Sequence, residues 1–202
     1  MEIENTLTFT PYKMRGYIHI IIGCMYSGKS TELQRILHRL DVINSSYLVL
    51  NHMIDKRYDE EGGIITHNKT KVPCLSTHTL MPILEHEQFL DYKTILIEEA
   101  QFYPDLFEFV TTCADVHKKH VILVGLSGDY KREPFGDICR LIPHAEKITK
   151  LDALCVICND GTTAHFTKKI FNKNTTNDQI DVGSTGKYIA VCRKHYNEDY
   201  IE

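Results

Sequence analysis

The stretch GCMYSGKSTEL, residues 23–33, constrains the fold of this 202-residue chain more than any other. Gly23 and the triplet Gly28-Lys29-Ser30 satisfy the pattern G-x-x-x-x-G-K-[ST] of a phosphate-binding loop. The run YIHIII at 17–22, rich in β-branched residues, precedes the loop and predicts a buried strand. Apolar residues at the spacing of one helix face follow it, namely Leu33, Ile36, Leu37 and Leu40. This context predicts a phosphate held by backbone amides at a helix N-terminus.

The residues of this loop are expected to share the binding of a nucleotide. We expect the Lys29 ammonium to reach the outer phosphates and the Ser30 hydroxyl to coordinate Mg²⁺. The glycines allow the backbone to wrap closely around the anion. The remaining candidate contacts to the phosphates are Gly23, Cys24, Met25, Tyr26, Ser27 and Gly28.

Two adjacent glutamates, Glu98 and Glu99, follow the apolar run TILI at 94–97. A phosphate-binding loop needs an acid at the end of a neighbouring strand to hold the magnesium ion. Neighbouring side chains of an extended strand point to opposite faces, so the two glutamates need not serve the same ion. We therefore predict that one organises Mg²⁺ and the other takes a proton from an acceptor hydroxyl. The alternative is two solvated charges at a strand end.

Further apolar runs predict an α/β fold. The segments 47–50, 94–99 and 121–126 are expected to be buried strands. Between the last two, residues 105–119 have the pattern of a helix with Phe109 and Cys113 facing inward. Alternating strands and helices predict a parallel sheet with crossover helices. After about Thr149 the sequence has short strand-like segments but no long helical pattern. We therefore expect a nucleotide-binding domain at 1–149 and a smaller domain at 150–202.

Composition narrows the class of protein. A net charge of −4 argues against a general nucleic-acid binder. We see no apolar run near the roughly 20 residues that span a bilayer and no apolar signal core at the start of the chain. A cytoplasmic protein that binds neither membrane nor nucleic acid is the expectation. Four of the cysteines are scattered and expected to be small buried or half-buried hydrophobes: Cys24, Cys74, Cys113 and Cys139.

The remaining cysteines form a candidate zinc site. Cys155-x-x-Cys158 and Cys192-x-x-His195 lie on either side of a polar, turn-rich segment. Two such pairs supply the four ligands of a closed, structural, tetrahedral Zn²⁺ site. His165 is a rival ligand that lacks the pair spacing. The site would join the two ends of a segment with too little apolar content to fold alone.

Taken together, these motifs resemble the thymidine kinases of the tetrameric, zinc-containing family. The similarity runs from about Gly16 to Tyr196 and includes GCMYSGKSTEL, EEAQFYPDLFEF, GLSGDYKREPFG and VGSTGKYIAVCRKH. The resemblance implies a P-loop NTPase-like (RecA-like) α/β domain followed by a small zinc-bound lasso. It also implies a homotetramer that transfers the γ-phosphoryl group of ATP to the 5′-hydroxyl of thymidine or deoxyuridine, a salvage step for DNA precursors.

Specific roles are implied by the same resemblance. Glu99 matches the catalytic base, and Glu98 stands at the magnesium-organising position that usually holds aspartate. Asp55 and Arg57 match residues near the phosphates, where Arg57 can stabilise charge on the transferred group. Gln101 belongs to the nucleotide-contacting stretch. ATP, Mg²⁺ and a structural Zn²⁺ are the implied cofactors.

The nucleoside pocket is likewise implied by resemblance, with aromatic walls and lasso backbone around the base. Its candidate residues are Met25, Phe102, Leu126, Tyr130, Phe135, Thr167, Gln179, Ile180, Asp181, Val182, Gly183 and Tyr188. The chain departs from the family pattern at Cys24 for proline, at Glu98 for aspartate and at Tyr130 for phenylalanine. Two alternatives stay open here: another phosphate-loop nucleoside kinase or NTPase, and a zinc-knuckle module that binds nucleic acid.

Overall fold

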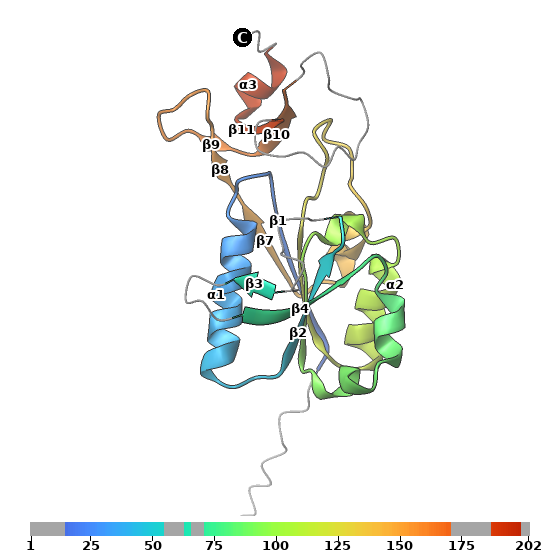
Figure 1. Ribbon diagram of the computed structural model, residues 1–202. Helices are drawn as coiled ribbons and strands as arrows, with labels where there is room; N and C mark the ends of the chain where they lie inside the picture. The colour runs from blue at the N-terminus through green and yellow to red at the C-terminus, as the bar shows by residue number, and fades with distance from the viewer. Residues whose placement is uncertain (1–14, 55–62, 66–70, 171–186, 199–202) are drawn as a thin grey trace, which may run out of the picture.

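A parallel β-sheet forms the centre of the computed structural model, which describes residues 15–54, 63–65, 71–170 and 187–198 (Figure 1). Its strands are β1 (Tyr17–Gly23), β2 (Tyr47–His52), β3 (Gly63–Ile65), β4 (Lys71–Thr77), β5 (Thr94–Ile97), β6 (His120–Gly125) and β7 (Lys147–Leu151). They lie in the order β3-β4-β2-β5-β6-β1-β7, and only β3 pairs antiparallel with its neighbour. The predicted α/β class is thus confirmed.

Helices cover both faces of this sheet, which is why its central strands are nearly continuous apolar runs. Helix α1 (Lys29–Val42) packs on one face, where Leu33 and Leu37 lie against Ile21 and Leu96. Figure 1 shows α2 on the opposite side. Besides β5 and β6, the chain between β4 and β7 forms short helices, which are Met81–Glu85, Glu87–Asp91, Ala100–Phe102, α2 (Leu106–Thr111), Thr112–Val116 and Ile138–His144. The predicted apolar face of α1 is therefore confirmed.

The helix expected at 105–119 is shorter and changes its pitch. After α2 the chain makes a π-helical turn at Thr112–Val116, in which the His117 amide donates to the Thr112 carbonyl at 3.1 Å. The Thr111 hydroxyl donates back to the Phe107 carbonyl at 2.8 Å, a contact that loosens regular helical bonding. Phe109 and Cys113 are both fully buried, as predicted.

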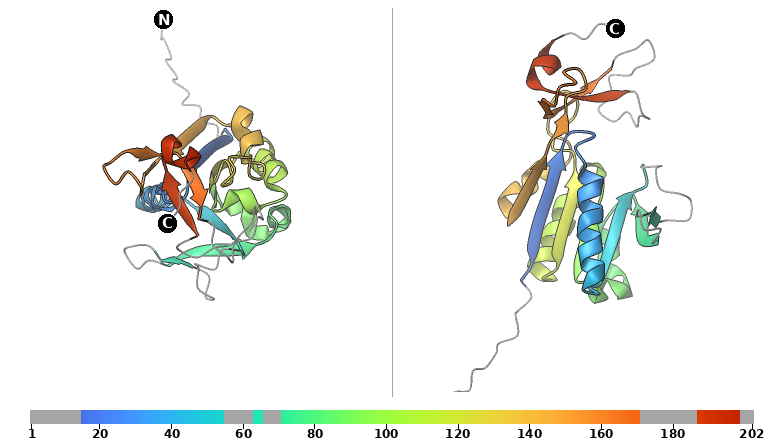
Figure 2. Two further views of the ribbon diagram at one scale, coloured as in Figure 1. Left: turned by 90° about the horizontal axis from the view of Figure 1, so that it is seen from above. Right: turned by 90° about the vertical axis from the view of Figure 1, so that its left-hand side faces the viewer.

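A small C-terminal part lies beyond the carboxyl ends of the central strands (Figure 2). It consists of β8 (Ala153–Leu154), β9 (Thr163–Ala164), β10 (Phe166–Lys169), β11 (Tyr188–Val191) and α3 (Arg193–Asn197). β10 pairs antiparallel with β11, and β8 with β9. Because β7 belongs to the central sheet, that sheet continues to Leu151, past the boundary expected near Thr149. The division into two domains remains a prediction.

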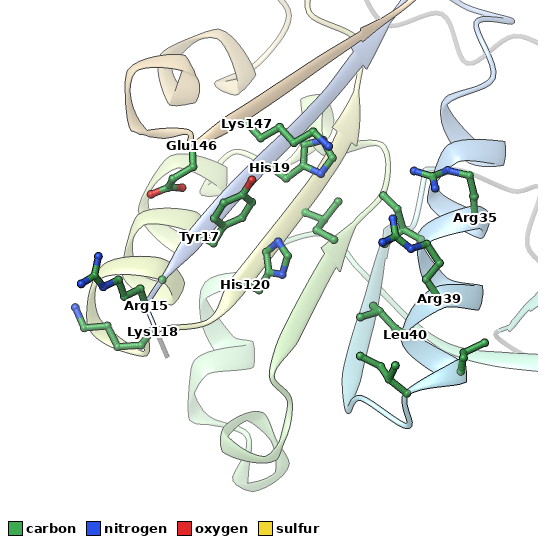
Figure 3. A pocket seen from close by; sticks show the side chains of 15 residues that line it. Arg15, Tyr17, His19, Arg35, Arg39, Leu40, Lys118, His120, Glu146 and Lys147 are labelled. Atoms are coloured by element: carbon green, nitrogen blue, oxygen red, sulfur yellow. The ribbon is translucent and has the colours of Figure 1, made fainter. Parts of the chain in front are cut away.

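An open groove of about 930 Å³ lies between α1 and the amino-terminal halves of β1, β6 and β7 (Figure 3). Arg15, Arg39, Lys118 and Lys147 are among its lining residues. Ligands of parallel α/β sheets bind at the carboxyl ends of the strands, so this groove is not the candidate active site. Within the described part of the chain, no helix is both long and apolar enough to cross a membrane.

His19, which lines this groove, should make folding stability pH-dependent. Burial first, and then the nearby positive charge of Lys147, lowers its pKa from 6.5 to about 4. Between these values the unfolded chain binds a proton that the folded chain does not, so stability falls as the pH is lowered through this window. The other groups that act on His19 are His120, Glu32 and Arg35.

Urea unfolding of the wild type and His19→Gln between pH 7 and 4 tests this prediction. We expect the variant to lose less stability than the wild type over that interval, whereas the exposed substitution His38→Gln leaves the profile unchanged. Parallel profiles for the wild type and His19→Gln would contradict the assignment.

Candidate active site

The loop at residues 23–30 has the backbone geometry of an anion-binding turn. Tyr26 and Gly28 have positive φ angles of 65° and 82°, and Lys29 begins α1 directly after them. A Cβ on Gly23 would lie 2.3 Å from Ser27 Oγ and 2.6 Å from the Leu151 carbonyl oxygen. Glycine is therefore required where β1 enters the loop, and the loop stands at the N-terminus of α1 as predicted.

Lys29 lies across this loop. Its ammonium donates hydrogen bonds to the carbonyls of Gly23 at 3.2 Å and Cys24 at 2.8 Å. The side chain thus lies over the same turn whose amides are expected to receive a phosphate. A negatively charged phosphate group is a stronger acceptor for an ammonium than a peptide carbonyl.

Ser30 and Glu98 form the pair expected at a magnesium site. The Ser30 hydroxyl donates to Glu98 Oε1 at 2.6 Å, and the glutamate is only 2% exposed. Its backbone amide donates to the Leu50 carbonyl at 2.8 Å, which holds Glu98 beside β2 after β5 has ended. An alcohol and a carboxylate placed together are oxygen ligands of the kind that Mg²⁺ prefers, so these residues fit the ion.

Glu99 does not continue the strand, which corrects the expectation of a strand over 94–99. β5 ends at Ile97, and Glu99 has the left-handed backbone angles φ 50° and ψ 40°. Such angles cost a non-glycine residue about 1–2 kcal/mol. The turn, rather than the alternation of an extended strand, therefore separates Glu99 from Glu98.

Gln101 holds the Glu99 carboxylate in place. Its side-chain NH₂ donates to Glu99 Oε2 at 2.7 Å, and its side-chain oxygen accepts from the Leu126 amide at 3.0 Å. Two glycines leave room for it: a Cβ on Gly125 would lie 2.5 Å from Gln101 Oε1, and one on Gly136 would lie 2.3 Å from the Gln101 carbonyl oxygen. Sequence reasoning placed Gln101 in the nucleotide stretch and missed this supporting role.

The predicted nucleoside-pocket residues meet in pairs. Phe102 packs edge-on against Phe135, with ring centroids 5.4 Å apart. The ring centroids of Tyr130 and Tyr188 are 6.4 Å apart. The ammonium of the buried Lys169 lies over both tyrosine rings, 5.0 Å and 5.8 Å from their centroids. No sequence motif marked Lys169, and its contact with the two rings is visible only in the folded chain.

Asp55, Arg57 and residues 179–183 lie outside the residues that the structure describes. Their predicted contacts to phosphate and base therefore remain predictions. The same holds for the roles, as distinct from the positions, of the pocket residues named above.

The four predicted zinc ligands converge. The donor atoms of Cys155, Cys158, Cys192 and His195 all lie within 4.8 Å of one another. Cys158 Sγ and Cys192 Sγ are 3.8 Å apart, close to the roughly 3.8 Å between two sulfurs that each lie about 2.3 Å from a tetrahedral Zn²⁺. The residues therefore fit a structural zinc ion.

The backbone around Cys155 favours its thiolate, whereas burial and the contact with Cys155 raise the pKa of Cys158. Although burial raises the pKa of the Cys155 thiol, hydrogen bonds from the backbone at Cys158 and Cys192 hold it at about 6. A thiolate is the form of cysteine that binds a metal. The rival His165 is not part of this cluster, and its Nδ1 lies 2.6 Å from Asp152 Oδ1 instead.

The zinc-ligand region also contacts the phosphate-binding loop. The Cys24 thiol donates to the Ala164 carbonyl at 3.4 Å, and the Met25 amide donates to Thr167 Oγ1 at 3.0 Å. The Tyr196 hydroxyl, next to the ligand His195, donates to the Tyr130 carbonyl at 2.7 Å. The small C-terminal part therefore positions loop and pocket residues as well as its own fold.

Comparison with known proteins extends these observations over nearly the whole chain. The sequence profile of the family "Thymidine kinase" matches residues 16–196. The chain is 40% identical over 182 residues to the thymidine kinase of Yaba monkey tumor virus (strain VR587), covering 90% of this chain and 94% of the viral protein. It is 36% identical over 194 residues to thymidine kinase 1 of Dictyostelium discoideum, covering 94% and 82%. It is 38% identical over 189 residues to thymidine kinase a of Arabidopsis thaliana, covering 92% and 77%.

Proposed function

The chain belongs to the thymidine kinase family, and from this premise we propose how its residues transfer a phosphoryl group from ATP to the 5′-hydroxyl of thymidine. The enzyme phosphorylates thymidine, as the family assignment and its viral and cellular relatives support. One observation carries the assignment of roles within the site. Gln101 joins the Glu99 carboxylate to the Leu126 amide, so the acid stands beside the predicted nucleoside wall.

The donor half of the site is the 23–30 loop. Its amides and the Lys29 ammonium bind the triphosphate, and the lysine exchanges its bonds to the Gly23 and Cys24 carbonyls for phosphate oxygens. Ser30 and Glu98 would hold Mg²⁺, which, when bound, neutralises charge on the β- and γ-phosphates. Asp55 and Arg57 are proposed to lie near the same phosphates, where Arg57 stabilises the transferred group.

The acceptor half is organised around Glu99. Its carboxylate accepts a hydrogen bond from the thymidine 5′-hydroxyl and takes that proton as the oxygen attacks the γ-phosphorus atom. The bond from the γ-phosphorus to the oxygen shared with the β-phosphate breaks in the same step, and ADP is the leaving group. The Gln101 amide orients this carboxylate through its hydrogen bond to Glu99 Oε2. Half-buried and held in a left-handed backbone conformation, Glu99 is positioned before substrate arrives.

The base is proposed to lie between aromatic walls, where a water-poor pocket strengthens polar contacts. The residues proposed to enclose it are Met25, Phe102, Leu126, Tyr130, Phe135, Thr167, Tyr188 and the backbone of 179–183. Zn²⁺ bound by Cys155, Cys158, Cys192 and His195 would join the two ends of the segment that bears these last residues.

A substrate panel tests the acceptor. With Mg-ATP, thymidine and deoxyuridine should be phosphorylated at the 5′-hydroxyl, and deoxycytidine and deoxyguanosine much more slowly. Product analysis by chromatography of each reaction distinguishes 5′-phosphorylation from simple ATP hydrolysis. ATP hydrolysis that no nucleoside accelerates would favour the alternative of a general phosphate-loop NTPase.

We further propose a homotetramer in the cytoplasm, which the family resemblance supports. None of the seven cysteines forms a disulfide, as suits a reducing compartment. Light scattering on the purified protein measures its oligomeric state. A monomer at micromolar concentration would overturn the tetramer but would leave the proposed reaction unaffected.

A further inference from the structure

Asn51, at the carboxyl end of β2, is a buried amide that finds no hydrogen-bond partner among the residues that the structure describes. The residue is 0% exposed, and within that part of the chain neither its side-chain nitrogen nor its side-chain oxygen makes a hydrogen bond. An unsatisfied buried amide costs stability, and native proteins retain such groups rarely. A buried amide that is retained at this cost is explained by a ligand that binds the folded protein and supplies the hydrogen bonds.

The register of the sheet puts Asn51 beside the magnesium-site carboxylate. Leu50 pairs with Ile97, and the Leu50 carbonyl accepts from the Glu98 amide at 2.8 Å, so Glu98, the residue that follows β5, lies next to Asn51 of β2. Side chains alternate along a strand. Val49 and Leu96, two residues earlier in each strand, both pack on the α1 face.

Asn51 therefore projects from β2 to the face that α1 covers. Glu98 reaches the same face, because its Oε1 accepts a hydrogen bond at 2.6 Å from Ser30 Oγ in the first turn of α1. The buried amide of Asn51 thus lies on the face of the Ser30–Glu98 pair, next to Glu98 across the sheet. Its neighbour His52 points to the other face, where its ring packs 4.9 Å from that of Tyr103.

We propose that Asn51 is a positioning residue for the Mg²⁺-triphosphate. Its carbonyl oxygen accepts a hydrogen bond from a water of the metal's hydration shell, and its NH₂ donates to a phosphate oxygen. An amide offers both functions, and Mg²⁺ usually keeps several waters that need acceptors. The inference rests on the proposed magnesium site at Ser30 and Glu98 and adds Asn51 to it.

The substitution Asn51→Leu separates this role from a structural one. Replacing an unsatisfied amide by an apolar group of similar volume should leave the melting temperature of the ligand-free protein unchanged or raised. Calorimetric ATP affinity in Mg²⁺ should fall about 10-fold, the lower end of what supporting residues of metal sites cost. Affinity in EDTA should fall by less, because only the hydrogen bond from the amide NH₂ to a phosphate oxygen is then lost. The matched control is Thr94→Val, a buried polar-to-apolar change at the amino end of β5, which should alter neither affinity.

Two results would overturn the proposal. One is an Asn51→Leu protein that keeps the full gain in ATP affinity on adding Mg²⁺. The other is loss of folding in both Asn51→Leu and Asn51→Ala, which would assign the amide to the core. If the wild type itself gains no ATP affinity from Mg²⁺, the proposed magnesium site fails first, so the two failures are distinguishable.

Discussion

Glu99→Gln is expected to lower kcat for thymidine about 1,000-fold, in the middle of the range that a general base contributes. Glutamine keeps the size of the side chain but has no carboxylate to take the 5′-hydroxyl proton. The affinity for ATP should stay within about twofold of the wild type, because Glu99 is proposed to face the acceptor and Ser30 and Glu98 the donor. Steady-state kinetics with thymidine, together with calorimetric ATP binding, measure the two effects separately.

The control for this experiment is Glu108→Gln, which removes an exposed carboxylate from α2. Its kinetics should match the wild type. Unchanged turnover in Glu99→Gln would remove Glu99 from the role of base. A parallel loss of ATP affinity would instead move Glu99 into the donor site.

The strands of the sheet were predictable because burial on both faces leaves a simple pattern. Runs such as those at 17–22 and 121–126 are apolar throughout, since both sides of β1 and β6 meet helices. α1 was predictable for the complementary reason, that only one of its faces is buried. The π-helical end after α2 was not, because it depends on a side-chain hydroxyl competing for a backbone carbonyl.

Some features of the candidate site follow from short sequence motifs, and others depend on residues that are far apart in the sequence. The phosphate-binding loop and the cysteine pairs are short motifs whose spacing alone predicts their geometry. The position of Glu99 depends on Gln101, which in turn needs the space left by Gly125 and Gly136. No local pattern links these residues, so the turn that ends β5 is visible only in the folded chain. The spacing also predicted His195 rather than His165 as the fourth ligand of the cluster, and the converging donor atoms confirm it.

Removing a zinc ligand should abolish zinc binding and unfold the C-terminal part of the protein. We expect wild-type protein to contain one zinc per chain and Cys155→Ser to contain almost none. Structural zinc contributes on the order of 10 kcal/mol to folding, which exceeds what the small hydrophobic cluster around Cys155, Ala164 and Val191 can replace. The C-terminal part beyond Leu151 should therefore lose its fold, which hydrogen exchange of β10 and β11 can detect.

The same substitution should lower kcat/KM for thymidine about 100-fold, although no zinc ligand is proposed to contact substrate. The hydrogen bonds from Met25 to Thr167 and from Tyr196 to Tyr130 would be lost together with the Tyr188 wall, and each such bond contributes about 1 kcal/mol. Cys139→Ser, at a half-buried cysteine outside the cluster, is the control and should retain both zinc and activity. A zinc-free Cys155→Ser enzyme with wild-type kinetics would show that the loop and pocket hold their geometry without the metal. In that case the contacts of the C-terminal part with Cys24 and Met25 would be consequences of folding rather than supports of the site.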